Sequence, residues 1–270
     1  MNTSTKNISK KPFKSFKPFS ERSIWQRALF SLLSLLAFLF IALGCVYLYL
    51  QSQLPSVDFL KVVQLQTPLR IYSSDGKLIG EYGQKRRIPV SYDQIPPMFV
   101  EAVLATEDRR FFQHSGVDII GLTRASVELV KTGAKTQGGS TITMQVARNF
   151  FLTRKKSYMR KINEIMLAMN IDRALSKQKI LELYLNTIYF GNRAYGVAAA
   201  ADVYYGKTLD QLTLPEMAML AGLPQAPSAH NPLSNPIKAK ERRNHVLLRM
   251  YEEGIINEAT YEEAIKTPLT

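Results

Sequence analysis

The stretch Thr106-Glu-Asp-Arg-Arg-Phe-Phe-Gln-His-Ser-Gly116 follows an apolar segment, Phe99-Val-Glu-Ala-Val-Leu-Ala105, that is typical of a buried helix. It places two adjacent carboxylates, Glu107 and Asp108, where that helix gives way to aromatic residues, a histidine and a glycine. A carboxylate beside apolar surface has its pKa raised towards neutrality, which suits proton transfer. The stretch therefore predicts an active-site carboxylate at the end of a core helix.

The rest of the chain is predicted to be mainly α. A β-hairpin region is expected from Leu69–Tyr72, a turn at Ser73–Gly76 and Lys77–Tyr82, with a third extended piece at Arg86–Tyr92. After residue 97 the apolar periodicity is helical, and Ser176, the pair Thr213 and Glu216, and Gly254 are expected at helix ends. The expected helices span residues 98–108, 117–131, 140–149, 156–174, 177–187, 193–203, 214–222, 236–253 and 257–266.

The amino-terminal 50 residues have the pattern of a membrane anchor. Residues 1–28 form a basic arm, and Leu29–Leu50 is an uncharged run that covers about 33 Å as a helix, enough for a hydrocarbon core of about 30 Å. A cleaved signal peptide would have a shorter core, and the lipoprotein-like Ala42-Leu-Gly-Cys45 lies inside a run that continues past the cysteine. We expect a retained transmembrane helix with the arm in the cytoplasm and the remainder outside. The expected domains are 1–28 (arm), 29–50 (transmembrane helix), 51–97 (linker and hairpin) and 98–270 (a mainly α catalytic domain).

The net charge of +13 favours an anionic partner or a solvated basic surface. Nucleic acid is excluded as a partner because the chain has an anchor and no nucleic-acid motif. Anionic ligands and lipid headgroups fit better. The single cysteine, Cys45, allows no intramolecular disulfide and so does not identify the compartment.

A second group of candidate residues follows the opening stretch. Gly138-Gly-Ser-Thr-Ile-Thr143 has the pattern of a loop entering a helix, where free N–H groups hold phosphate oxygens, or of an ordinary glycine turn with a cap. Glu164 shares a helix face with Arg160 and Lys161, either as a plain ion pair or as a second active-site carboxylate held ionised among cations. The basic residues could offset the charge of a diphosphate or form a solvated face; they are Arg148, Arg154, Lys155, Lys156, Arg160 and Lys161.

The histidines and aromatic residues of the opening stretch favour structural roles. His114 has no His or Cys at metal-ligand spacing, and His230 and His245 are distant in the sequence, so a hydrogen-bonding histidine is expected. Phe111 and Phe112 are expected in the core rather than against a substrate.

Together these stretches resemble a known enzyme family. Glu107–Gly116, Gly138–Gln145 and Arg160–Glu164 are similar to the first three motifs of the peptidoglycan glycosyltransferases (glycosyltransferase family 51). Lys179–Asn186 and Glu216–Ser228 resemble the fourth and fifth, so the ordered motifs cover about residues 98–235. The anchor and hairpin region further resemble the amino-terminal part of class A penicillin-binding proteins. One departure is Met144, where many relatives carry glutamine.

The resemblance implies a lysozyme-like α fold outside the cytoplasmic membrane and polymerisation of lipid II into glycan strands. Glu107 would deprotonate the acceptor's GlcNAc 4-hydroxyl, which attacks the donor's anomeric carbon with inversion while undecaprenyl diphosphate leaves; Glu164 would support the donor. Asp108, Phe111, His114 and Gly116 would shape the first motif around the substrate. The residues expected to hold the diphosphate and sugars are Gly139, Ser140, Thr141, Gln145, Arg148, Asn149, Arg160 and Lys161.

No cofactor is implied as required, and a divalent cation at the diphosphate stays open. The expected partners are lipid II, the growing glycan strand, the cytoplasmic membrane and other cell-wall synthesis proteins. Apolar residues at Val117–Ile120, Val127–Val130 and Phe150–Leu152 could form a membrane-dipping jaw or plain core.

Two other functions stay open, as does the question of whether the chain is part of a longer class A enzyme. A lysozyme-like lytic hydrolase would cleave the wall without a lipid-linked donor, and a membrane scaffold would work without Glu107. Ser74–Lys77 and Lys131–Gly133 match transpeptidase signatures by letter, but they lie too close together and lack a Ser-x-Asn between them. We therefore expect either a piece of a longer class A enzyme or a monofunctional one.

Overall fold

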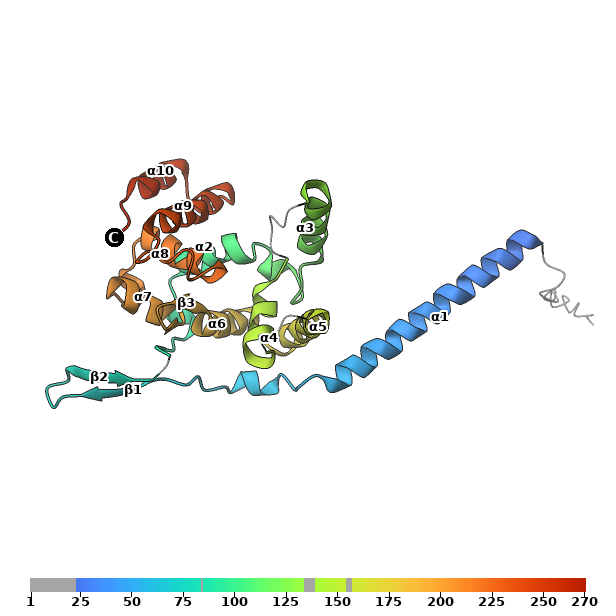
Figure 1. Ribbon diagram of the computed structural model, residues 1–270, viewed down its shortest axis with the longest axis horizontal. Helices are drawn as coiled ribbons and strands as arrows, with labels where there is room; N and C mark the ends of the chain where they lie inside the picture. The colour runs from blue at the N-terminus through green and yellow to red at the C-terminus, as the bar shows by residue number, and fades with distance from the viewer. Residues whose placement is uncertain (1–22, 84, 134–138, 154–156) are drawn as a thin grey trace, which may run out of the picture. The chain divides into compact units, whose positions relative to one another are not determined.

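The computed structural model describes residues 23–83, 85–133, 139–153 and 157–270, in two compact units that divide after Gln53 (Figure 1). The first unit contains one helix, α1 (Ile24–Gln53), which is exposed along its length and is long and apolar enough to cross a membrane. The helix is therefore longer at both ends than the predicted transmembrane run, residues 29–50.

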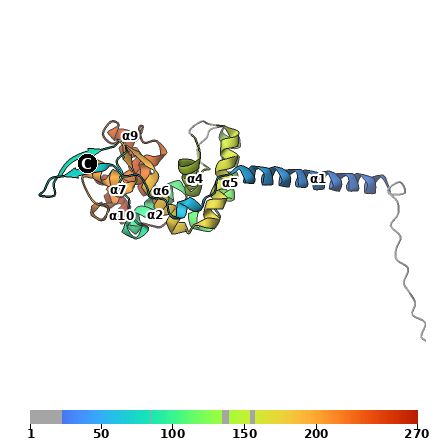
Figure 2. The same cartoon turned by 90° about the horizontal axis from the view of Figure 1, so that it is seen from below.

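The second unit begins with a short 3₁₀ turn, Asp58–Lys61, and an antiparallel hairpin of β1 (Leu69–Tyr72) and β2 (Leu78–Tyr82). The hairpin extends away from the helices in Figure 1, and in Figure 2 its tip projects beyond them. The predicted third extended piece is wrong as a member of this sheet, because the sheet has two strands and Arg86 forms a single β-bridge with Ala194 instead. A 3₁₀ turn, Tyr92–Gln94, then leads into the helices.

The remaining helices confirm the predicted series, with ends shifted by a few residues. Ser176 caps α6, Thr213 and Glu216 form a capping box on α8, and Gly254 follows α9 in the left-handed region at φ +72°. These helices are α2 (Pro97–Glu107), α3 (Ile119–Thr132), α4 (Ile142–Phe151), α5 (Tyr158–Ala174), α6 (Lys177–Thr187), α7 (Val197–Tyr205), α8 (Leu214–Gly222), α9 (Pro236–Glu252) and α10 (Glu258–Lys266).

The largest departure is at the predicted helix 193–203, which begins only at Val197. A second hairpin, β3 (Tyr189–Gly191) with β4 (Ala194–Tyr195), precedes it, and both residues of its turn, Asn192 and Arg193, have positive φ. The sequence does not predict this turn, because such turns usually contain Asn-Gly and the second residue here is an arginine.

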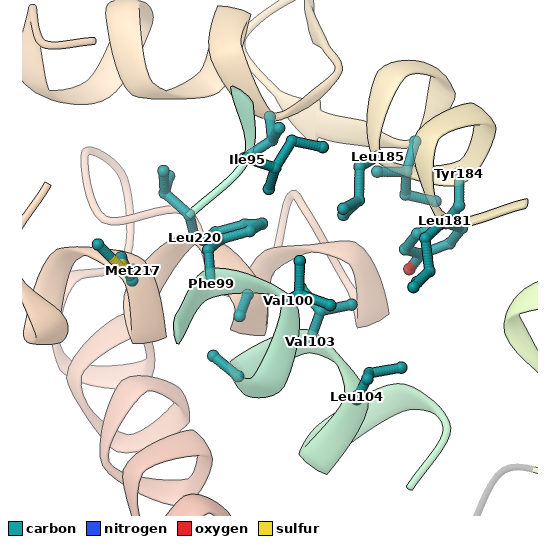
Figure 3. Packing of buried hydrophobic residues seen from close by; sticks show 14 of the residues in the cluster. Ile95, Phe99, Val100, Val103, Leu104, Leu181, Tyr184, Leu185, Met217 and Leu220 are labelled. Carbon is teal, nitrogen blue, oxygen red and sulfur yellow. The ribbon is translucent and has the colours of Figure 1, made fainter. Parts of the chain in front are cut away.

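The core surrounds α2, which packs against α8 and α9 and contributes Phe99, Val103 and other apolar side chains. Figure 3 shows Phe99 and Val100 of α2 facing Leu220 of α8, with Leu181 and Leu185 of α6 nearby. Phe99 and Leu220 are completely buried. Because α2 lies inside this core, its last residue, Glu107, is held on a rigid support.

Candidate active site

Glu107 ends α2, and its side chain meets α4. The Gln145 side-chain amide donates to Glu107 Oε2 over 2.9 Å. Burial raises the pKa of the Glu107 carboxyl, while the Gln145 hydrogen bond and the charges of Arg242 and Arg148 oppose that rise. A half-buried carboxylate with a raised pKa beside cations is suited to accept a proton.

Asp108 joins the first motif to the start of α4. Its carboxylate accepts from His114 Nε2 at 2.9 Å and from the Ile142 backbone N–H at 2.9 Å. The Thr141 hydroxyl caps α4 by accepting from the Met144 N–H and donates to the Gly116 carbonyl at 2.6 Å. These hydrogen bonds fix the register between α2 and α4, and therefore the meeting of Glu107 with Gln145.

The far end of the first motif lies against α5. Gly116 has φ +85°, and a Cβ built on it would overlap the Ala168 carbonyl oxygen and lie 2.8 Å from the carbonyl carbon. Glycine is therefore required here both by backbone conformation and by space.

His114 and Phe111 have interior, structural positions, as the sequence predicts, whereas the prediction that Phe112 lies in the core is wrong, because it is 54% exposed. The His114 side chain is 5% exposed and contacts Asp108, and its backbone carbonyl accepts from Lys177 Nζ at 2.6 Å. Lys177 Nζ also lies 4.6 Å from the centre of the buried Phe111 ring and 2.5 Å from Asp172. Phe111 and His114 thus shape the first motif, and their contact with the substrate stays a prediction.

Glu164 of the third motif is completely buried between two cations. Arg160 donates to it at 3.2 Å and Lys161 at 3.0 Å. Lys161 Nζ also donates to the Ser140 hydroxyl at 2.9 Å, so the second and third motifs meet. Glu164 thus forms the ion pairs that both interpretations of the sequence require, and its role in the active site stays a prediction.

A cavity of about 650 Å³, here called the first cavity, lies beside Glu107. Gly139, Ser140, Thr141, Gln145 and Arg148 line it, together with Glu107 and Asp108. The carboxylate and a cation of the predicted diphosphate site thus share one cavity.

The sequence analysis missed the contribution of α9 to the first cavity. Arg242, His245 and Arg249 line it, and Arg242 also donates to the Gly222 carbonyl at 3.1 Å. His245, which is distant from His114 in the sequence, thus lies in the wall of the first cavity. The signal that could have found this face is the basic run of α9, with Arg242 and Arg249 seven residues apart on one side of the helix.

A second cavity, of about 570 Å³, lies on the other side of Arg148, which lines both. Asn149 and Arg160 border it, as do Lys85 and Arg87 from the segment before α2. The predicted diphosphate residues are thus divided between two cavities that meet at Arg148.

Residues 75–251 of the chain match the transglycosylase family. The chain belongs to this family. It is 56% identical over 223 residues to penicillin-binding protein 1A of Pseudomonas aeruginosa, and 54% identical over 236 residues to that of Escherichia coli K12. The matches cover 83% and 84% of this chain but 27% and 28% of those relatives, so the chain spans about a quarter of their length.

A crystal structure of penicillin-binding protein 1A from Haemophilus influenzae is also similar. It is 38% identical, with a TM-score of 0.47, and the match covers 77% of this chain and 21% of the other.

The transglycosylase domain brings together most of the residues predicted for its site. The first cavity collects seven of them: Glu107, Asp108, Gly139, Ser140, Thr141, Gln145 and Arg148. The second takes Asn149 and Arg160, and Lys161 donates to Ser140. Phe111, His114, Gly116 and Glu164 line neither cavity. The predicted contributions of Gly138 and of residues 154–156 lie outside the described residues.

Proposed function

We propose that this transglycosylase domain is a peptidoglycan glycosyltransferase that polymerises lipid II into glycan strands during bacterial cell-wall synthesis. The observation that carries the proposal is Glu107, a half-buried carboxylate of raised pKa that shares the first cavity with Arg148 and Arg242. The names of the relatives, penicillin-binding protein 1A, support the same assignment.

In the proposed reaction, Glu107 accepts the proton of the acceptor's 4-hydroxyl as that oxygen bonds to the donor's anomeric carbon. The bond from that carbon to the diphosphate oxygen breaks, and the electron pair leaves with the lipid diphosphate. Because the diphosphate leaves as a stable anion, cations such as Arg148 contribute more than a strong general acid would. Attack opposite the leaving group inverts the anomeric configuration.

The other motif carboxylates support a transferase over a hydrolase that needs a paired acid and base. Asp108 is occupied by His114 and the Ile142 N–H, and Glu164 by Arg160 and Lys161. In a hydrolase of this type Glu107 would be the acid, and neither of these carboxylates is free to act as its partner base or nucleophile.

Incubation of the purified chain with lipid II separates the candidate functions. A glycosyltransferase yields glycan polymer and undecaprenyl diphosphate. A lytic enzyme would instead release fragments from preformed glycan, and a scaffold would leave both substrates unchanged.

The exposed apolar side chains of α3 support the proposal that the enzyme acts at the surface of the bilayer. Ile119 is 74% exposed and Val130 is 86% exposed, so for these positions the jaw interpretation is favoured over plain core. We propose that α1 anchors the chain in the cytoplasmic membrane, with the basic arm inside and the catalytic domain outside. There α3 would dip into the outer leaflet, where the substrate's lipid tail remains.

Replacing Ile119 and Val130 together by serine should lower lipid II turnover in bilayers several-fold while leaving the thermal unfolding temperature unchanged. The exposed side chains contribute little to folding, whereas each apolar side chain that enters lipid contributes roughly 1.5–3 kcal/mol. Turnover in phosphatidylcholine nanodiscs and thermal melts by circular dichroism measure the two effects. Equal turnover in nanodiscs would contradict a membrane role for α3.

The hydrogen bond from Gln145 to Glu107 should be visible in the pH dependence of turnover. This bond lowers the pKa of Glu107 against the effect of burial, so Gln145→Ala raises that pKa further. Because the base must be deprotonated, the acid limb of kcat/KM should move to higher pH in the variant. An unmoved or lowered limb would show that Gln145 does not tune the catalytic base.

A further inference from the structure

Tyr184 of α6 brings a hydroxyl group into the core. The residue is completely buried, and its hydroxyl has no hydrogen-bond partner among the described residues. Buried polar groups are nearly always paired, because an unpaired one has lost its hydrogen bonds to water and gained nothing in return. The unpaired hydroxyl therefore indicates a partner that it meets in another arrangement of the side chains around it.

The Tyr184 hydroxyl lies on the side of α6 that faces α2. Figure 3 shows its oxygen directed from α6 towards α2, where Val103 and Leu104 lie. Glu107 follows Val103 by four residues in the same helix, so these two side chains share one face of α2. The hydroxyl is thus directed towards the face of α2 that carries Glu107 one turn further on.

The electrostatic surroundings of Tyr184 also place it near Glu107. Burial raises the pKa of the Tyr184 hydroxyl well above its usual range, and the charge of Glu107 raises it further. Arg148 lowers this pKa and Asp108 raises it, both by smaller effects. Tyr184 is therefore a neutral hydroxyl at neutral pH, and Glu107 is the charged group that acts on it most strongly.

The Glu107 carboxylate has room for a second hydrogen bond. Its Oε2 accepts from the Gln145 amide at 2.9 Å, and the described residues provide no hydrogen bond to Oε1. A carboxylate can accept about four hydrogen bonds. Three charged groups act on this carboxylate from the elements around it: Arg242 of α9, Arg148 of α4 and the neighbouring Asp108.

We propose that Tyr184 is a positioning residue for the base, whose hydroxyl donates a hydrogen bond to the ionised Glu107 carboxylate, directly or through one water. The inference rests on the proposed function, in which Glu107 is the base. The bond stabilises the ionised carboxylate and leaves its other lone pairs to the acceptor hydroxyl. Because a hydroxyl can also accept, Tyr184 keeps a hydrogen bond with the carboxyl group after that group has taken the proton.

Tyr184→Phe in the full chain removes the hydroxyl and keeps the ring. The kcat for lipid II polymerisation should fall about tenfold, the loss expected for one hydrogen bond to a charged group, with little change in KM. The acid limb of kcat/KM should move to higher pH, because the ionised form of Glu107 loses a donor. The melting temperature should equal that of the wild type or exceed it, since phenylalanine leaves no unpaired polar atom in the core.

Tyr205→Phe is the matched control. Tyr205 is half-buried in α7 and lines neither cavity, and the charges that act on it are those of Glu216 and Arg243. This variant should keep the kcat and the acid limb of the wild type. An unmoved acid limb in Tyr184→Phe would overturn the proposal whether or not turnover falls, because lost turnover alone fits a purely structural role. A limb that moved equally in the control would overturn it as well.

Failure of the proposed function would appear differently, as a wild type that forms no polymer from lipid II. The ionisation of Glu107 can then be followed without turnover, by carbon-13 NMR of glutamate-labelled protein in detergent micelles. The spectrum of Glu107→Gln identifies the resonance. The pKa of Glu107 should be higher in Tyr184→Phe than in the wild type and unchanged in Tyr205→Phe. Equal values in the wild type and Tyr184→Phe would overturn the hydrogen bond whatever reaction the site performs.

Discussion

Replacing Gly116 by alanine is expected to destabilise the domain by about 3–5 kcal/mol, which is in the range of the largest single-residue effects. The left-handed backbone at φ +85° costs about 1–2 kcal/mol for any residue with a Cβ. The larger part comes from the overlap with the Ala168 carbonyl, which is backbone inside α5 and cannot rotate away. Separation of the first motif from α5 would relieve the overlap, so turnover should fall together with stability. Thermal melts measure the effect as a drop of about 6–20 °C, from roughly 2–4 °C per kcal/mol.

Gly206 provides the matched control for this prediction. It follows α7 at φ +63°, with no atom within 4 Å of a built Cβ. Gly206→Ala therefore carries only the conformational cost, and the difference between the two variants isolates the close approach to α5. Equal melting temperatures for the two variants would show that the approach at Ala168 is readily relieved.

Periodicity, turn residues and caps predict the helices of this chain well because local chemistry determines each of them. Ser176 caps α6 through a hydrogen bond within its own first turn, and the box of Thr213 and Glu216 is equally local. The pairing of Arg86 with Ala194 joins residues more than a hundred positions apart and leaves no local pattern. The sequence therefore indicates the helices but not the segment that supports the second cavity.

The residues of the candidate site likewise fall into those that motifs predict and those that only the tertiary structure brings to the cavities. Glu107, Gln145 and Arg148 are predicted by their motifs, and the structure brings them to one cavity. Arg242 and Lys85 enter the two cavities only because α9 packs on α2 and because the segment before α2 pairs with β4. Without the tertiary structure, each resembles an ordinary solvated cation.

Glu107→Gln is expected to lower the rate of lipid II polymerisation by about 10²–10⁴-fold, the usual contribution of a positioned general base. The amide keeps the size of the side chain and its contact with α4, but it cannot accept the proton of the acceptor hydroxyl. Fluorescent lipid II and gel separation of the glycan products measure the rate.

The same variant should be at least as stable as the wild type at neutral pH. The folded-state pKa of Glu107 is raised, so the fold disfavours the ionised form. Its contribution to stability is thus lost as the pH rises from the unfolded pKa through the folded pKa, and a neutral glutamine avoids that cost. Circular dichroism at neutral pH checks this, and a clear loss of helical signal would mean that lost activity reports unfolding.

The pH dependence of polymerisation in Glu107→Gln tests the assignment of the base most directly. The wild type should lose kcat/KM as the pH falls through the raised pKa of Glu107, and the residual activity of the variant should lack this acid limb. An unchanged acid limb, or a rate within a few-fold of the wild type, would show that another group takes the proton and would contradict the account.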